Sequence, residues 1–327
     1  MDPKGKRITA VRLSALGDIA MTIPAVKALA LTYPDIAVTF ITDARFAGLV
    51  ADAPENLTIV GLPKNKLKGL KAIPAVTKAI RESKPDFVVD MHNVVKTTVP
   101  TILFGLAGKK TAVLDKKRRQ RKAILEGKIN AEPFTQRYLD LFAEIGFPVK
   151  EEKIKSSPQK NQSGAIRVGI APFARYYTKT YPPELTEELI RKLNERGKTE
   201  IFLFGGGAAE IEKLTEWGKK YPAVKYISGK STLAEEIELM HTLDAMVSMD
   251  SANMHLASLA GTKVISVWGG TTPSCGFLGW GQSIENAIVA GVDCQPCSIA
   301  GTPTCPKGRN LICMTRISPD DIIERIL

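Results

Sequence analysis

The chain has 327 residues, of which 44% are hydrophobic and 24% charged, and its net charge is +11. This length suits two domains of about 150 residues each, and no apolar run reaches the roughly 18 residues that a membrane-spanning helix needs. The start MDPKGKR is not followed by an apolar signal region. This argues against secretion and predicts a cytoplasmic protein.

The positive charge is concentrated in the first half of the chain. Residues 1–150 contain 25 Lys/Arg and 14 Asp/Glu, whereas residues 151–327 contain 20 of each. Most of the excess lies in KNKLKGLK (64–71) and KKRRQRK (116–122). Two such runs favour an anionic partner over a merely solvated surface. No aromatic residues are interleaved with them, which disfavours nucleic acid. We expect an acidic substrate, with contact to an anionic membrane as the accompanying hypothesis.

Short apolar, β-branched segments alternate with amphipathic segments along the whole chain. This alternation predicts an α/β fold with parallel sheets covered on both faces. Strands are predicted at 7–13, 36–42, 57–61, 86–91 and 111–114, and again at 166–171, 199–205, 224–228, 245–249 and 263–268. Helices are predicted at 19–33, 69–83 and 134–145, with a terminal helix that Ser318 caps.

A polar segment at 150–167 has the composition of an interdomain linker. We therefore predict two Rossmann-like, doubly wound domains, 1–155 and 165–327, that face a cleft. In such sheets ligands bind beyond the carboxyl ends of the strands, so the loops that follow the strands should carry the chemistry.

Two loops of the first domain contain polar side chains at strand ends. The turn LSALGD (13–18) leads from a strand into a helix, which is a usual phosphate site, yet its Asp18 would repel phosphate. The loop DMHNVVKT (90–97) offers His92, Asn93 and Lys96. With Lys64 and Arg118 from the basic runs, these three are the candidate residues for binding an anionic partner.

Three loops of the second domain should converge at one end of its sheet. The first, APFARYYTKTYPPE (171–184), contains Lys179, and the second, FGGG (204–207), precedes Glu210. In the third, Asp250 or Ser251 can cap a helix that starts with small residues such as Ala252 and contains His255. A lysine, an acid and free helix N–H groups together predict a nucleotide-diphosphate site. The chain lacks a Walker lysine motif and a complete G-x-G-x-x-G, which disfavours an NTPase or a classical dehydrogenase.

Four late cysteines, Cys294, Cys297, Cys305 and Cys313, follow the pattern C-x2-C-x7-C-x7-C. In a cytoplasmic chain such clustering favours a structural zinc over disulfides. The second pair lacks the tight spacing of a zinc ribbon, so unligated thiols or a redox-sensitive pair are the alternatives.

Several of these stretches together resemble glycosyltransferase family 9, the ADP-heptose:lipopolysaccharide heptosyltransferases. The matching pieces are RLSALGDIAMTIPAVKAL, DMHNVVKT, K-x-Y-P at 179–182, FGGGAAE and, most specifically, MDSANMHLASLAGTKVISVWGGTTP. The resemblance covers nearly the full length. It implies a GT-B fold, with the acceptor on the N-terminal domain and the nucleotide-sugar on the C-terminal one. It also implies inverting transfer, without a metal or other cofactor, to the lipopolysaccharide inner core at the inner face of the cytoplasmic membrane.

The resemblance assigns roles to individual residues. Asp18 matches the catalytic base, Lys179 the diphosphate-binding lysine and Glu210 the acid near the nucleoside. The donor-contacting turn matches Asp250, Ser251, Ala252 and His255, where Asp250 would hold sugar hydroxyls. The acceptor would be an acidic, lipid-linked saccharide.

The chain departs from the family pattern at two places in the second domain. Tyr181 stands where the family often has Trp, and Ser251-Ala252 where it often has Thr-Gly. A nucleotide-sugar donor is therefore a firmer expectation than ADP-heptose itself. The alternatives are a GT-B transferase or epimerase with another nucleotide-sugar, and a non-catalytic protein that binds polyanions or membrane surfaces.

Overall fold

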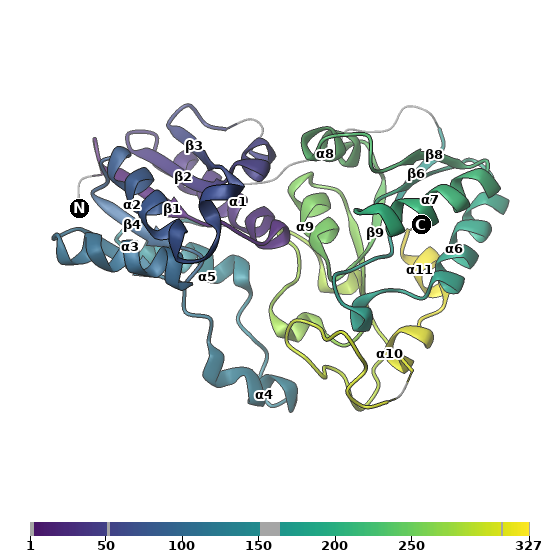
Figure 1. Ribbon diagram of the computed structural model, residues 1–327. Helices are drawn as coiled ribbons and strands as arrows, with labels where there is room; N and C mark the ends of the chain where they lie inside the picture. The colour runs from purple at the N-terminus through teal and green to yellow at the C-terminus, as the bar shows by residue number, and fades with distance from the viewer. Residues whose placement is uncertain (1–2, 51–52, 151–163, 309, 327) are drawn as a thin grey trace. The chain divides into compact units, whose positions relative to one another are not determined.

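The computed structural model describes residues 3–50, 53–150, 164–308 and 310–326, and the chain separates into two compact units (Figure 1). Unit 1 consists of Met1–Arg118 and Phe134–Lys155, and unit 2 of Arg119–Pro133 and Ser156–Leu327. Most of the predicted linker lies outside the described residues, and its last two residues, 166 and 167, already belong to the first strand of unit 2.

Unit 1 is built on five parallel strands in the order β3-β2-β1-β4-β5. The strands are β1 (Arg7–Val11), β2 (Ala37–Asp43), β3 (Leu57–Leu62), β4 (Phe87–Asp90) and β5 (Lys110–Val113). The helices are α1 (Leu16–Thr32), α2 (Ala72–Glu82), α3 (Val95–Leu106) and α5 (Phe134–Glu144), with 3₁₀ turns η1 (Ala44–Leu49), η2 (Lys64–Leu67) and η3 (Gly69–Lys71).

The two faces of this sheet are covered by different helix pairs. In the register of the sheet Val11 lies beside Ile41 and Asp90, and Val11 and Ile41 pack in one apolar cluster with the buried face of α2. Because side chains alternate along a strand, Arg12 points to the other face, where it contacts Tyr138 of α5. Thus α2 and α3 cover one face, and α1 and α5 cover the other.

Unit 2 contains a six-stranded parallel sheet in the order β11-β10-β9-β6-β7-β8. The strands are β6 (Ile166–Ala171), β7 (Thr199–Leu203), β8 (Val224–Ile227), β9 (Ala245–Met249), β10 (Val264–Trp268) and β11 (Ala287–Val289). The α-helices are α4 (Arg121–Leu125), α6 (Pro183–Glu195), α7 (Ala208–Lys220), α8 (Leu233–His241), α9 (Ala252–Leu259), α10 (Ile312–Thr315) and α11 (Pro319–Ile326). The 3₁₀ turns are η6 (Tyr177–Lys179), η7 (Pro273–Cys275) and η8 (Ile284–Asn286), while η4 (Arg118–Gln120) spans the boundary of the units.

Both sheets follow the Rossmann strand order, in which the direction of winding reverses between the first and fourth strands. That reversal lies between β1 and β4 in unit 1, and between β6 and β9 in unit 2. Ligands of such sheets bind in the crevice that forms at the carboxyl ends of these two strands. The topology therefore directs attention to four loops, those after β1, β4, β6 and β9.

The sequence analysis predicted most of this architecture. All ten predicted strands are present, and the terminal helix starts where expected, with Ser318 Oγ accepting a hydrogen bond from Asp321 N at 3.2 Å. It missed β11, which has only three residues, and it did not separate the segment Arg119–Pro133. That segment packs Ile124 and Ala131 against Cys275 of unit 2. Among the described residues, no helix combines the length and apolarity needed to cross a bilayer.

Candidate functional site

The loop after β1 places a carboxylate in the first turn of a helix. Helix α1 begins at Leu16, three residues earlier than predicted, because Ala15 takes the extended N-cap conformation and Asp18 becomes its third helical residue. The Ala15 N–H donates to Asp18 Oδ2 at 3.2 Å. A carboxylate at this position is stabilised by the positive end of the helix dipole. Asp18 therefore stabilises the start of α1, which explains in part why an acid occupies this position.

The same carboxylate is held by a buried arginine. Arg12 Nη2 lies 2.5 Å from Asp18 Oδ2, and its other nitrogens donate to Ser14 O at 2.8 Å and Met91 O at 2.6 Å. The arginine is buried, whereas the Asp18 side chain is 30% exposed. Both Arg12 and the Ala15 N–H contact Oδ2. The guanidinium fixes the position of the carboxylate and leaves it accessible to a ligand.

The loop after β4 is shaped by its own side chains. Asp90, which is buried, accepts hydrogen bonds from the backbone N–H groups of His92 and Asn93, each at 2.9 Å. Asn93 has a left-handed backbone conformation with φ of 48°, and its Nδ2 donates to Leu114 O at 2.6 Å. The Asn93 side chain therefore ties the ends of β4 and β5 together, in addition to any role in binding.

His92 lies in a strongly positive environment. It is buried, and its Nε2 is 3.4 Å from Ser14 Oγ in the loop after β1. Burial, and then the positive charges of Arg12, Lys116 and Lys96, lower the pKa of His92 to about 2. The imidazole is therefore neutral at physiological pH. The same cations make this end of the sheet attractive to an anionic ligand.

The remaining candidates of unit 1 are less closely grouped. Arg118 is near enough to Lys116 for its charge, after burial and Arg12, to lower the lysine's pKa. Lys116 itself donates to Asn93 O at 3.0 Å. The sequence analysis placed Lys116 in a basic run without selecting it. Lys64 is exposed on η2, on the far side of β2, where its charge acts on Asp43.

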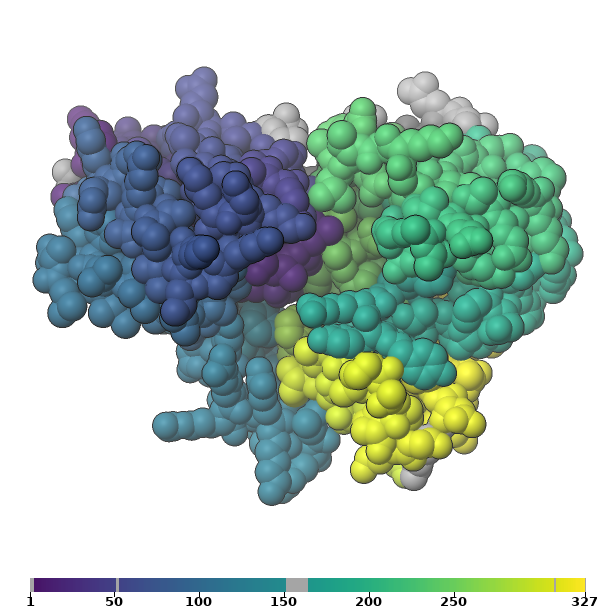
Figure 2. Space-filling view, viewed as in Figure 1, coloured from purple at the N-terminus to yellow at the C-terminus, as the bar shows by residue number. Residues whose placement is uncertain are grey.

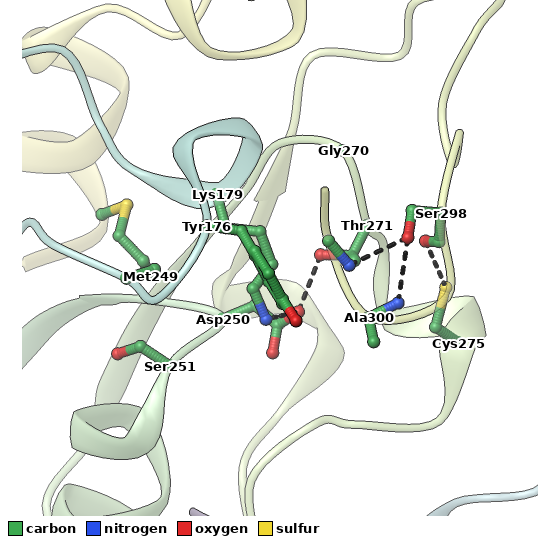
Figure 3. A network of polar contacts seen from close by, with 12 residues as sticks. Tyr176, Lys179, Met249, Asp250, Ser251, Gly270, Thr271, Cys275, Ser298 and Ala300 are labelled. Atoms are coloured by element: carbon green, nitrogen blue, oxygen red, sulfur yellow. Dashed lines mark hydrogen bonds and ion pairs between the residues drawn. The ribbon is translucent and has the colours of Figure 1, made fainter. Parts of the chain in front are cut away.

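In unit 2 the loops after β6 and β9 meet in an ion pair. Lys179 Nζ lies 3.0 Å from Asp250 Oδ2; Asp250 is buried, and the Lys179 side chain is 12% exposed. The same oxygen accepts a hydrogen bond from Thr271 Oγ1, in the loop after β10, at 2.7 Å. Figure 3 shows these three side chains converging from separate loops. Two of them were predicted. Thr271 lies in the GGTTP stretch, but nothing in the sequence indicated its contact with Asp250.

Close backbone packing fixes the turn that carries Lys179. Gly270 N donates to Thr178 O at 2.7 Å, and a Cβ atom on Gly269 would come within 2.3 Å of the same oxygen. Thr178 Oγ1 also donates to Thr302 O at 2.9 Å. Only glycine permits this approach at position 269, so the loop after β10 sets the position of Lys179.

Helix α9 begins directly after this ion pair. Ser251 is its N-cap residue, but its side chain accepts no hydrogen bond from the first turn, and Asp250 is engaged by Lys179 and Thr271 instead. We predicted that Asp250 or Ser251 would cap this helix. Ser251 does not, and the contacts of the Asp250 carboxylate are with Lys179 and Thr271. Ala252 is the first helical residue, and His255 is buried one turn later. The first-turn N–H groups and the helix dipole give this end an affinity for anions.

Glu210 and Tyr181 take structural positions near these loops. Glu210, in the first turn of α7, accepts a hydrogen bond from Gly206 N at 2.7 Å and so orders the glycine-rich loop after β7. Tyr181 is buried in the core of unit 2, and its hydroxyl donates to Ile317 O at 2.7 Å. The departure from Trp at this position is thus accommodated inside the core.

The four late cysteines line one small cavity. It measures about 10 Å³ and also touches Thr178, Gly269 and Gly270, so it lies behind the turn that carries Lys179. Figure 2 shows this segment, in yellow, at the surface of unit 2. None of the five cysteines of the chain is in a disulfide. Burial, and then the charges of the neighbouring thiols, raise the pKa of Cys313 to about 11. Within the described residues, however, no three His, Cys, Asp or Glu side chains form a ready metal-binding group.

Comparison with known proteins places this geometry in a family. A model of glycosyltransferase family 9 (heptosyltransferase) matches residues 73–305. The chain is 25% identical over 280 residues to the lipopolysaccharide core heptosyltransferase OpsX of Haemophilus influenzae, covering 80% of this chain and 79% of that protein. It is 23% identical over 354 residues to lipopolysaccharide heptosyltransferase 1 of Pseudomonas aeruginosa, covering 98% and 97%.

A solved structure shows the same fold. The Escherichia coli heptosyltransferase WaaC with ADP matches with a TM-score of 0.69 and 18% sequence identity, over 98% of this chain and 100% of that one. Together with the two parallel-sheet units, this confirms the predicted GT-B fold.

Proposed function

The chain belongs to glycosyltransferase family 9, and from this premise we propose that it transfers a heptose from ADP-heptose to the inner core of lipopolysaccharide. The relatives named above are lipopolysaccharide heptosyltransferases, and the similar structure was solved with ADP. The single observation that carries the proposal is the Lys179–Asp250 pair beside the N-terminus of α9, at the winding reversal of unit 2.

The donor would bind to unit 2. A lysine ammonium has three N–H donors, so Lys179 can keep one hydrogen bond to Asp250 and direct others to diphosphate oxygens. The N–H groups at the start of α9 supply further positive potential. Asp250 Oδ2 already accepts from two residues, and a carboxylate offers further acceptor sites for sugar hydroxyls. Glu210 would accept from the ribose while holding the loop after β7.

The acceptor would bind to unit 1, with Asp18 as the catalytic base. In an inverting transfer the acceptor hydroxyl attacks the anomeric carbon from the side opposite the departing diphosphate, and a carboxylate takes the hydroxyl proton. The C–O bond to the acceptor forms as the bond to the diphosphate breaks. Asp18 is the partly exposed carboxylate at the winding reversal of this unit. The cations around His92 would attract the phosphates and carboxylates of a lipid-linked, acidic saccharide.

The leaving group gains negative charge in the transition state. Lys179 and the start of α9 would stabilise that charge with groups that are already in place, which is the most effective form of electrostatic catalysis. We therefore propose transfer that needs no metal ion. Since the acceptor is an amphiphile, the enzyme would work as a peripheral protein at the inner face of the cytoplasmic membrane.

A structural metal at the four cysteines is a separate proposal. Their thiols line one cavity, and burial followed by the charges of the neighbouring thiols raises the pKa values of Cys297 and Cys313. A bound cation would remove this repulsion. Thiolates are preferred ligands of zinc and iron. Since Cys297 N bonds to Gly270 O at 3.0 Å, a metal there would brace the Lys179 turn. Elemental analysis of the purified protein tests this. Less than a stoichiometric amount of zinc or iron would leave the thiols unligated.

The function is tested by incubating the purified protein with ADP-heptose and a Kdo-bearing lipid A acceptor, with and without EDTA. We expect the mass of the acceptor to increase by one heptose, with inversion at the anomeric carbon by NMR and no effect of EDTA. Parallel reactions with GDP-, UDP- and CMP-linked sugars test the donor. A donor that epimerises without acceptor would identify an epimerase. Salt-sensitive binding to any polyanion without transfer would indicate a non-catalytic binder.

A further inference from the structure

Helix α3 of unit 1 turns most of its aliphatic residues outward. Its inward side consists of Thr97, Pro100 and Thr101, which are buried, and of Phe104, which packs against the apolar cluster shared with α2. The two threonine hydroxyls are satisfied within the helix, at Val94 O and Thr97 O. A helix on the surface of a soluble domain normally turns its aliphatic residues inward. Neighbouring α2 does so, burying Val76 and Ile80 while Lys78 and Glu82 remain exposed.

The outward side of α3 is an aliphatic stripe. Its members recur at helical spacing on one face and are Val95, Val99, Ile102, Leu103 and Leu106. Leu106 is 82% exposed, Val95 61% and Ile102 53%. Leu70 of η3, which packs beside α3, is 69% exposed. A contiguous exposed patch of this kind marks an interaction surface rather than scattered surface residues.

Lysines border this stripe at both ends, with no carboxylate between them. At one end Lys96 Nζ contacts Leu67 O at 3.4 Å, which joins α3 to the segment that contains Lys64, Lys66, Lys68 and Lys71. At the other end Lys109 and Lys110 follow the helix and are exposed. Residues 56–81 and 91–114 contain nine Lys/Arg and no Asp or Glu. Glu82 of neighbouring α2 is exposed but pairs with Lys78 at 3.7 Å, so the excess charge around the apolar stripe is positive.

We propose that this surface, the stripe of α3 with Leu70 and the flanking lysines, docks unit 1 on an anionic lipid bilayer. A protein partner would need a complementary acidic groove, whereas a bilayer supplies both required chemistries in one plane. Its acyl boundary takes the aliphatic side chains, and its anionic headgroups take the lysines. The stripe is about 18 Å long, as expected for 12 helical residues, which suits a helix lying in the interface rather than crossing it.

The biological purpose of this docking rests on the proposed function, because an enzyme held at the membrane reaches a membrane-embedded acceptor best. The binding itself can be tested without transfer. Wild-type protein is mixed with vesicles of phosphatidylglycerol and phosphatidylethanolamine, or of phosphatidylcholine alone, and the bound fraction is measured by co-sedimentation at low and high salt. We expect binding to the anionic vesicles that weakens with salt, and little binding to the neutral ones.

Two variants separate the apolar and the charged contributions. Ile102→Ser/Leu106→Ser should lower the partition coefficient about tenfold or more, and Lys66→Gln/Lys68→Gln/Lys71→Gln should weaken binding and reduce its salt dependence. The matched control is Leu31→Ser, an exposed leucine of α1 on the other face of the sheet, which should bind as wild type does. Circular dichroism confirms that each variant is folded.

Three results would overturn the proposal. They are wild-type binding that does not distinguish the two lipids, serine variants that bind as wild type does, and a dimer that the serine substitutions dissociate in gel filtration. The last would assign the stripe to a second copy of the chain. If transfer to lipopolysaccharide fails while vesicle binding follows these expectations, the proposed function is lost and the docking surface is retained.

Discussion

The two units share a strand order and differ in what stands at the point where it reverses. Each has a pair of opposite charges there, Arg12–Asp18 in unit 1 and Lys179–Asp250 in unit 2. In unit 1 the cation is the more buried partner and the carboxylate is accessible. In unit 2 the carboxylate is buried, and the ammonium is the more exposed of the two.

This inversion is what the roles proposed for the two units require. In unit 1 the carboxylate occupies the first turn of α1 and uses the helix dipole, so that helix start is not offered to an anion. In unit 2 the side chain of Ser251 does not cap the start of α9. The positive end of this helix dipole therefore lies beside the ammonium of Lys179. An accessible carboxylate suits proton removal, and an accessible cation beside free N–H groups suits a diphosphate.

The contrast between the two units depends most on Asp18 acting as the catalytic base. Asp18→Asn keeps an oxygen for Arg12 and the Ala15 N–H but removes the basicity, so kcat should fall by about 10²- to 10⁴-fold. Affinity for ADP, measured by calorimetry, should stay unchanged because the nucleotide is assigned to unit 2.

The control for this substitution is Asp43→Asn. Asp43 also stands at a strand end of unit 1 and is paired with an arginine, Arg45, at 2.7 Å. It should retain near-normal turnover. An Asp18→Asn enzyme within tenfold of wild type would remove Asp18 from the chemistry and leave it as a helix-stabilising residue.

The role of the cation in unit 2 is tested by Lys179→Gln. Glutamine can still donate to Asp250, so the buried carboxylate is not left without a partner. Loss of the charge should weaken ADP binding about 10- to 100-fold, the equivalent of about 1.5–3 kcal/mol for hydrogen bonds to a charged group.

Lys192→Ala provides the control for Lys179→Gln, because it removes a lysine of unit 2 that pairs with Asp320 at the surface. We expect it to bind ADP as wild type does. Equal ADP affinity in the Lys179→Gln and wild-type proteins would contradict a diphosphate-binding role.

The support of Lys179 by neighbouring backbone predicts an effect on stability. A methyl group at Gly269 would collide with Thr178 O, so Gly269→Ala should lower the free energy of unfolding by about 1–3 kcal/mol, as overpacking commonly does. It should also weaken ADP binding by moving the Lys179 turn.

Gly206→Ala is the matched change for Gly269→Ala, since a Cβ atom at Gly206 would meet nothing within 4 Å. Urea unfolding should show it to be near neutral or slightly stabilising. Similar losses of stability in the two variants would mean that the close approach at Gly269 is relieved elsewhere.

The sequence predicted features that depend on a local pattern. It did not predict contacts between residues that are far apart in the chain. Strand periodicity and the loop residues Asp18, Lys179 and Asp250 could be read directly. The start of α1 was misplaced because Ala15 is not a usual N-cap residue. Arg12 and Thr271 were not selected, since their partners are defined by strand alternation and by the packing of the loop after β10. The outward-facing aliphatic stripe of α3 could not be predicted, because threonine and proline are not usual inward-facing residues.

Burial, and then the positive charges near it, lower the pKa of His92 in unit 1, and this predicts an effect of pH on stability. The folded pKa of His92 is about 2, below its ordinary value of 6.5, so the unfolded chain binds a proton more readily than the folded one between these values. The contribution of His92 to stability is therefore complete above pH 6.5 and is lost as the pH falls. Between pH 7 and 5.5 this loss amounts to about 1 kcal/mol.

Replacing the imidazole with an amide should remove this sensitivity. In His92→Gln, the fall in unfolding free energy between pH 7 and 5.5, measured by urea denaturation, should be smaller than in wild type by about that 1 kcal/mol. Identical pH dependence in the two proteins would mean that the pKa of His92 in the folded protein lies near its ordinary value of 6.5.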